Sequence, residues 1–219
     1  DDGSFVCGEA RVPFSNIIAA PEGGMLVTDR GGGFTFGCNA REKKITAFDN
    51  ESRLDSPSEA LFFEEKGNLW SALDRSEKGD FYCAHGRGYT EYARSYNGCT
   101  VKTTVFLSRT GSKFYAVSVK NDVNEHRKIN VCYALAPVLG DFFDSNGCSI
   151  SINKTNDGVF ELKNHKNGMK AFLKFEGICF EKINASVDLI NKMLKKPIKL
   201  PCFSTMCDIV LYCFYRFDY

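Results

Sequence analysis

The sequence has no excess of charge of either sign and no long hydrophobic run. Its 28 basic and 27 acidic residues give a formal net charge of +1, so it lacks the basic footprint of a nucleic-acid-binding protein. It has no basic amphipathic stretch for a membrane surface. Its most apolar segment, residues 202–217, is shorter than a bilayer span and contains Asp208 and Arg216. We therefore expect no nucleic-acid or membrane partner, and the acidic first residues suggest no signal peptide.

Closely spaced cysteines are also lacking, although the chain has ten cysteines. They are scattered without any C-x-x-C pair, and none of the three histidines, His85, His126 and His165, lies at ligand spacing from a cysteine. The spacing therefore predicts no zinc or other metal site. Because free cysteines in strand-like runs behave as small buried hydrophobes, we expect reduced structural thiols and a cytoplasmic location.

What the sequence does have is a repeated strand pattern over residues 81–176. Asn97-Gly98 separates the strand-like runs 88–96 and 99–107, and Asn-Gly between two such runs is the strongest short hairpin signal. Residues 113–121 place Tyr115, Val117 and Val119 on one face. Further strands are expected at residues 127–139, 148–154, 159–163 and 169–176. Strands and turns at this spacing predict a large antiparallel β-sandwich.

The two ends of the chain have weaker patterns. Short strands are expected at residues 16–20, 24–28 and 58–65, and Gly31-Gly32-Gly33 is interpreted as a flexible turn because it lacks the Lys-Ser/Thr of a phosphate loop. We place the sandwich domain at residues 1–176, followed by a helical and irregular tail at 177–219. Within the tail, residues 184–196 have helical spacing and Pro197 ends the pattern.

We expect the last residues, 197–219, to form a poorly ordered or exposed tail, because their apolar side chains lack a partner. Deletion from about Gly177 would then improve the behaviour of the chain. The alternative is an extra strand, in which Ile209 to Phe214 covers the edge of a sheet.

No catalytic residues are assigned. Pairs of carboxylates close in sequence occur at Asp49/Glu51, Glu64/Glu65 and Asp74/Glu77. Glycoside chemistry needs two carboxyl groups facing each other across a cleft, which sequence proximity does not supply. We interpret these pairs as solvated surface, and no motif indicates a cofactor.

Two segments are candidates for carbohydrate contact. Residues 33–50 and 85–89 combine aromatic, amide, guanidinium and carboxylate side chains with glycines, which suits sugar hydroxyls and ring faces. The candidate substrate-binding residues are Asn39, Arg41, Glu42, His85, Arg87 and Tyr89. The alternative is that both segments are polar loops that organise the sandwich, with Arg41 held by an internal carboxylate.

These segments belong to a longer series of motifs that resembles glycoside hydrolase family 94, formerly glycosyltransferase family 36. The family's N-V-I-A-N-P resembles residues 16–21 (Asn-Ile-Ile-Ala-Ala-Pro), and its G-F-L-V resembles residues 24–27. Its G-F-T-W resembles residues 33–36, and its N-S-R-E-N-R-L-T resembles residues 39–46. Similarity continues with G-E-A-L-Y at residues 58–62 and V-W-S at residues 69–71. It extends to H-G-x-G-Y at residues 85–89 and L-T-V-F-V at residues 103–107. The motifs keep the family's order from Asn16 to Gly140.

The resemblance implies the amino-terminal supersandwich domain of a β-glucan phosphorylase or cyclic β-1,2-glucan synthase. In that family a helical linker and an (α/α)6 barrel follow, and the barrel supplies the aspartate general acid and binds inorganic phosphate. Here Phe36 and Phe48 stand where tryptophans are common, Lys43-Lys44 replaces Asn-Arg, and the resemblance fades after Glu176. The chain alone is therefore expected to be inactive.

The resemblance leads to one expected function and two alternatives. We expect a non-catalytic domain whose loops shape the β-glucan or oligosaccharide cleft of the neighbouring barrel. The alternatives are a free-standing carbohydrate-binding module and a structural domain that forms a homodimer without contacting sugar.

Overall fold

In the computed structural model, the described part of the chain is all-β, and its strands pair antiparallel. The structure describes residues 3–48, 57–141, 149–176, 197–200 and 207–214. The strands are β1 (Phe5–Val6), β2 (Ser15–Ala20), β3 (Gly23–Thr28), β4 (Gly31–Phe36), β5 (Lys44–Thr46), β6 (Glu59–Glu65), β7 (Asn68–Ser71), β8 (Asp80–Gly86), β9 (Tyr89–Tyr96), β10 (Cys99–Leu107), β11 (Lys113–Asn121), β12 (Arg127–Leu135), β13 (Pro137–Gly140), β14 (Ile150–Lys154), β15 (Phe160–Asn164), β16 (Lys170–Glu176), β17 (Pro197–Leu200) and β18 (Cys207–Phe214).

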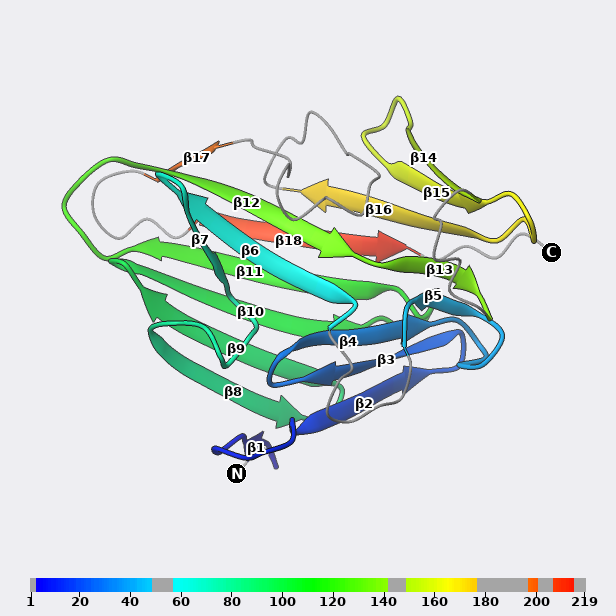
Figure 1. The fold of residues 1–219 in the computed structure, drawn as a ribbon, viewed down its shortest axis with the longest axis horizontal. Helices are drawn as coiled ribbons and strands as arrows, with labels where there is room; N and C mark the ends of the chain where they lie inside the picture. Colours follow the sequence, from blue (N-terminus) through cyan, green and yellow to red (C-terminus); the bar gives the residue numbers. More distant parts are fainter. Residues whose placement is uncertain (1–2, 49–56, 142–148, 177–196, 201–206, 215–219) are drawn as a thin grey trace.

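These strands form three sheets in two layers. The large sheet has nine strands in the order β1-β8-β9-β10-β11-β18-β16-β15-β14. A four-stranded sheet (β17-β12-β6-β7) and a five-stranded sheet (β13-β5-β4-β3-β2) lie side by side over one face of it (Figure 1). The expected antiparallel sandwich is therefore confirmed. Among the described residues there is no helix with the length and apolarity to cross a membrane.

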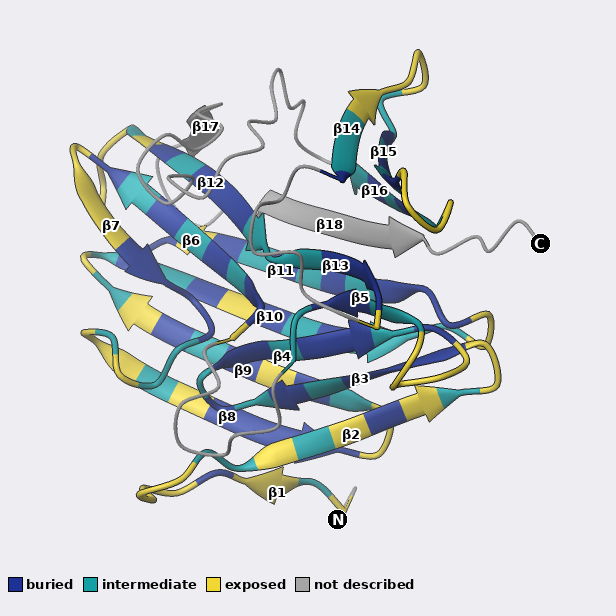
Figure 2. Cartoon of the chain, turned by 45° about the vertical axis from the view of Figure 1, so that its right-hand side comes forward, coloured by how far each residue is buried: buried dark blue, intermediate teal, exposed yellow. Residues whose placement is uncertain are grey.

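The core lies between the layers and follows the alternation of the strands. In β11, Tyr115, Val117 and Val119 are buried, while the residues between them are half-buried. In β12, Ile129, Val131 and Tyr133 face the same core. Figure 2 shows this alternation along the neighbouring strands. The predicted faces are confirmed because side chains of one strand point alternately to opposite sides of the sheet.

The β9–β10 hairpin has the predicted turn. Asn97 and Gly98 both have positive φ, 50° and 67°, as the favoured two-residue hairpin turn requires. The flanking residues Tyr96 and Cys99 are cross-strand partners. The turn residues therefore set the register of this hairpin.

The interpretation of Gly31-Gly32-Gly33 as a flexible turn is wrong. These residues begin β4, and Gly31 and Gly32 are buried. A Cβ on Gly32 would lie 2.6 Å from the Tyr115 hydroxyl and 2.8 Å from the Glu59 Cβ. The glycines are needed because β4 passes very close to side chains of the other sheets.

The last described strand, β18, lies inside the large sheet. Leu211 is paired with Tyr115 of β11 on one side and with Phe175 of β16 on the other. The expected poorly ordered tail is therefore wrong for residues 207–214, which form the extra strand of the alternative, at a central position of the sheet and not at its edge. The predicted helix at residues 184–196 lies outside the described residues.

Candidate functional site

The first predicted group, Asn39, Arg41 and Glu42, lies on the exposed loop between β4 and β5. The Asn39 Oδ1 accepts hydrogen bonds from the backbone N–H of Arg41 (2.8 Å) and of Glu42 (3.1 Å). The Lys43 N–H donates to the Asn39 carbonyl at 2.9 Å. Asn39 thus fixes the loop from within, as Asn does in turns, while Arg41 and Glu42 are exposed.

No internal ion pair holds Arg41 among the described residues. Neither its guanidinium nor the Glu42 carboxylate has a hydrogen-bond or ion-pair partner within that part of the chain. The alternative in which an internal carboxylate holds Arg41 therefore has no support there. Both charged groups are exposed on a loop whose backbone is already ordered.

Aromatic rings close to this loop pack against one another. Phe34 stacks on Phe48 with ring centroids 4.0 Å apart and on Phe36 at 5.2 Å. The Phe36 ring also covers Gly24, where an added Cβ would lie 2.2 Å from the ring. This stack supports the loop from its buried side.

The second predicted group lies at the end of the β8–β9 hairpin: His85 is in β8, Arg87 is in the turn, and Tyr89 begins β9. Arg87 is exposed, Tyr89 is half-buried and His85 is buried. Asn16, at the start of β2, donates from Nδ2 to the carbonyls of Gly86 and Tyr89, both at 3.0 Å. Of the three predicted residues, only Arg87 is fully accessible to a ligand.

His85 has internal partners at both ring nitrogens. Its Nδ1 lies 3.0 Å from the Thr90 Oγ1, and its Nε2 lies 3.3 Å from the Phe14 carbonyl. Burial lowers the pKa of His85, because the charged imidazolium is less well solvated there. The side chain therefore organises the turn and does not face solvent.

The two predicted groups do not form one site. The β8–β9 turn contacts β2 at Asn16, whereas the β4–β5 loop follows Phe36, which pairs with Gly24 near the other end of the β2–β3 hairpin. The two groups belong to one series of motifs in the sequence, but the strand pairing of β2 with β3 and of β3 with β4 places them at opposite ends of the β2–β3 hairpin.

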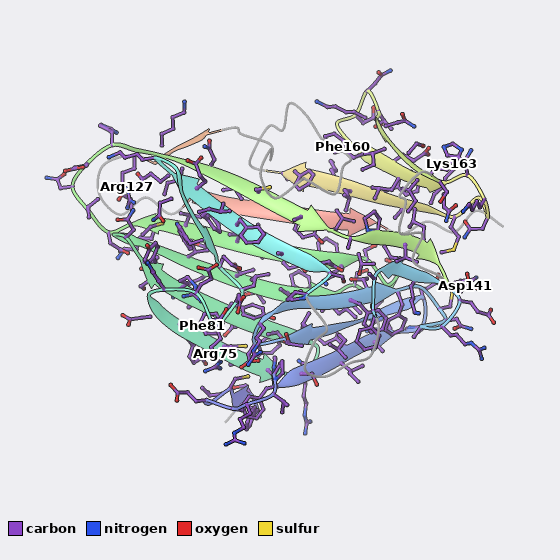
Figure 3. All side chains as sticks on the ribbon, in the orientation of Figure 1. Arg75, Phe81, Arg127, Asp141, Phe160 and Lys163 are labelled. Atoms are coloured by element: carbon purple, nitrogen blue, oxygen red, sulfur yellow. The ribbon has the colours of Figure 1, made fainter. Side chains whose placement is uncertain are left out.

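A polar hollow that the sequence analysis missed lies beside β6 and β12. Its volume is about 880 Å³. It is lined by Glu65, Lys66, Asn68, Asn97, Gly98, Val123, Glu125, His126, Arg127, Lys128 and Asn130. Figure 3 labels Arg127, one of these lining residues, at the left of the view. The lining comes from three separate segments, so no local motif could reveal it.

An ion pair holds one wall of this hollow. The Arg127 Nε donates to the Glu65 Oε1 at 2.9 Å, Nη2 donates to Oε2, and Nη1 donates to the Gly98 carbonyl at 2.6 Å. The hydrogen bonds from Arg127 lower the pKa of the Glu65 carboxyl against the opposing effect of burial. The interpretation of Glu65 as solvated surface is wrong, since the side chain is 7 % exposed and paired.

A second ion pair is completely buried where the three sheets meet. The Lys113 Nζ of β11 lies 2.9 Å from the Glu59 Oε2 of β6. The same carboxylate accepts from the hydroxyls of Tyr115 (2.9 Å) and Tyr133 (2.6 Å). Thr35 of β4 also donates to Glu59.

The partners of Glu59 keep it ionised. Burial alone would raise the pKa of its carboxyl, but Lys113 and the hydroxyl donors hold the pKa below its ordinary value. Each acceptor site is used inside the protein, so we assign this cluster to the framework. The sequence did not reveal it because its members are far apart in the chain.

The fold also brings together three potential metal ligands. The ligand atoms of Cys7, Cys83 and His85 all lie within 4.8 Å of one another. The sequence-based prediction of no metal site considered linear spacing alone, and the pairing of β1 with β8 creates this proximity.

The strand order defines a large antiparallel β-sandwich built from three sheets. The family model "Glycosyl hydrolase 94, supersandwich domain" matches residues 8–153. The chain belongs to this family.

Two curated relatives agree with this assignment. The chain is 26 % identical over 141 residues to the cyclic beta-(1,2)-glucan synthase NdvB of Rhizobium meliloti, and 20 % identical over 130 residues to the N,N'-diacetylchitobiose phosphorylase of Vibrio proteolyticus. These alignments cover 61 % and 56 % of the chain but only 5 % and 16 % of the relatives. The chain is thus similar to a small part of each.

Proposed function

We propose that the chain is a non-catalytic domain of a glycoside phosphorylase-like or glucan synthase-like protein. In this proposal the β4–β5 loop lines the carbohydrate cleft of a neighbouring (α/α)6 catalytic domain, which supplies the general acid and the phosphate site. The observation that carries it is the exposure of Arg41 and Glu42 on a loop that Asn39 already orders.

The chemistry of the loop suits a sugar. Arg41 offers a planar fork of donors, and the adjacent Glu42 offers two acceptor oxygens. Sugar hydroxyls both donate and accept, so such a pair can bind neighbouring hydroxyls of one ring. Because the loop backbone is ordered beforehand, binding costs less conformational entropy than it would with a flexible loop.

A second candidate is a carbohydrate-binding module that acts through the polar hollow. Amide, carboxylate and guanidinium groups from three segments line this hollow, and the Glu65–Arg127 pair keeps one wall rigid. In this case the chain would bind sugar without any catalytic domain.

The experiment has two parts. First, the chain alone is incubated with β-glucans and phosphate, and binding and release of sugar 1-phosphate are measured; we expect neither. Second, in a polypeptide that joins this chain to a family 94 catalytic domain, we expect Arg41→Ala to raise KM for the glucan by about tenfold, the loss of one charge-assisted hydrogen bond, with unchanged thermal stability. Lys102→Ala, an exposed change on β10, is the control.

Other results would favour the alternatives. Glucan binding by the chain alone that is lost in Asn68→Ala would indicate the second candidate. A homodimer without sugar binding would indicate a structural domain. An unchanged KM in the Arg41 variant would contradict the loop proposal.

A further inference from the structure

The pairing of β1 with β8 forces two cysteines to face each other. Phe5 is paired with His85 and Val6 with Ala84. The next residue, Cys7, donates its N–H to the Cys83 carbonyl at 2.9 Å. Side chains two residues apart on a strand share one face, so Cys83 and His85 lie on the same side of β8, and Cys7 joins them from across the ladder.

The resulting cluster has the dimensions of a metal site. The two sulfur atoms and the imidazole nitrogen lie within 4.8 Å of one another. Around a tetrahedral zinc ion, with Zn–S of about 2.3 Å and Zn–N of about 2.0 Å, the ligand atoms lie about 3.5–3.8 Å apart. The ligand atoms would need to approach one another by little more than about 1 Å to reach these distances.

We propose that Cys7, Cys83 and His85 bind a thiophilic divalent cation, Zn²⁺, which fastens the amino-terminal strand to the large sheet. Two thiolates neutralise the charge of the ion, so the complex can remain in a buried place. Cys7, Cys83 and His85 are only 6 %, 0 % and 9 % exposed. With three protein ligands, the fourth position would be taken by a water molecule.

The surroundings can hold these ligands in position. The Arg75 Nη2 donates to the Cys7 carbonyl at 2.9 Å, and its Nε donates to the Asp29 carboxylate at 2.7 Å. Arg75 is labelled beside β8 in Figure 3. When one nitrogen of His85 binds the ion, the other can keep its present oxygen partner, which is the usual arrangement around metal-bound histidines.

The strand just before Cys7 has few pairings that hold it to the sheet. β1 has two residues and lies at the edge of the large sheet, and Phe5 and Val6 are 52 % and 55 % exposed. Its described strand pairing consists of two residue pairs with β8. A metal bond at Cys7 would join this short strand to β8, whose Cys83 belongs to the core.

The test uses the full chain, reduced and freed of metal with a chelator. Titration with Co²⁺ should give one equivalent of thiolate-to-cobalt charge-transfer absorption, and Zn²⁺ should displace the cobalt and raise Tm. Cys7→Ser should lower the Zn²⁺ affinity at least about tenfold, the loss that even an outer-shell change produces, and should abolish the Tm shift.

Cys99→Ser and Cys132→Ser are matched controls, because Cys99 and Cys132 are also free, buried cysteines but lie outside the cluster. Both should bind like the wild type. Since Cys83→Ser changes the core, circular dichroism must first show that this variant is folded. The proposal is overturned if the folded wild-type chain gives no cobalt–thiolate absorption, or if Cys7→Ser and folded Cys83→Ser bind as tightly as the wild type.

Discussion

At the residue scale, buried charge is the feature that distinguishes this sandwich from a purely apolar one. Lys113 and Glu59 are 0 % and 1 % exposed, yet they form an ion pair that also engages two tyrosine hydroxyls. Removal of one member of such a pair leaves an uncompensated buried charge. The cluster therefore favours the one arrangement in which all three sheets meet correctly.

Lys113→Met tests this cluster. We expect it to lower the free energy of unfolding by about 3–5 kcal/mol, because the Glu59 carboxylate loses its cation. Urea denaturation measures the change. Lys120→Met is the control, since its ion pair with Asp122 is largely exposed and should change stability by no more than about 0.5 kcal/mol. Equal effects of the two substitutions would contradict the framework role.

Glu65 should contribute to the pH dependence of stability. Arg127 holds the pKa of its carboxyl below the ordinary value of 4.5. The unfolded chain therefore takes up this proton at a higher pH than the folded chain, so the stabilisation is present above about pH 4.5 and is lost as pH falls through the lower folded value.

Glu65→Gln should accordingly be less stable than the wild type at pH 7, and the difference should shrink below pH 4.5. Urea denaturation at several pH values measures it. Glu161→Gln, which affects a more exposed pair with Lys170, should keep the slope of the wild type. Parallel curves for wild type and Glu65→Gln would rule out this contribution.

At the element scale, local patterns predicted most of the strands and missed the contacts between sheets. Residues 113–121 were predicted and form β11, and Asn97-Gly98 forms the expected turn. The alternation of a strand and the residues of a turn are local properties, so each can be recognised within a single segment of the sequence. The Glu59 cluster, the hollow beside Arg127 and the Cys7–His85 proximity arise from pairings between distant segments, which a single sequence does not specify.

The candidate site shows the same division. Motifs identified the exposed Arg41 and Arg87, but the internal role of His85 depends on its hydrogen-bond partners, Thr90 and the carbonyl of Phe14. The prediction of a flexible turn at the glycines of β4 is wrong for a similar reason. Composition suggested flexibility, whereas their role depends on Tyr115, which comes much later in the chain.

Gly32→Ala tests the close packing of β4. The added methyl group would meet the Tyr115 hydroxyl and Glu59, so we expect a loss of about 1–3 kcal/mol, as is usual for an overpacked core. Gly8→Ala is the control, because no atom lies within 4 Å of its added Cβ. Thermal unfolding compares the two, and an unchanged Tm for Gly32→Ala would contradict the described packing.

At the scale of the whole molecule, β18 connects two parts of the large sheet. It separates β11 from β16, so β14–β16 join the other strands of this sheet through it. We expect truncation after Glu176 to destabilise the chain and expose two strand edges, contrary to the benefit that the tail sequence alone suggested. Size-exclusion chromatography and thermal unfolding would show this, and a monomeric truncated chain with unchanged Tm would contradict it.

Leu211→Pro provides a milder version of this test within the full chain. A proline in a strand with neighbours on both sides loses a ladder hydrogen bond, so we expect a loss of about 3 kcal/mol or more. Asn156→Pro is the control, because it occupies the second position of the Thr155–Gly158 turn, where proline is favoured. Equal stability of the two variants would refute a central role of β18.

The position of β18 has a consequence for how the protein is made. A ribosome adds about 5–20 residues per second, so β11 leaves the exit tunnel several seconds before its neighbour β18 is synthesised. During this interval the nascent chain carries an open strand edge that other nascent chains could pair with. The yield of correctly folded protein should therefore depend on whether a chaperone binds this open edge, and on how fast the residues after β16 are translated.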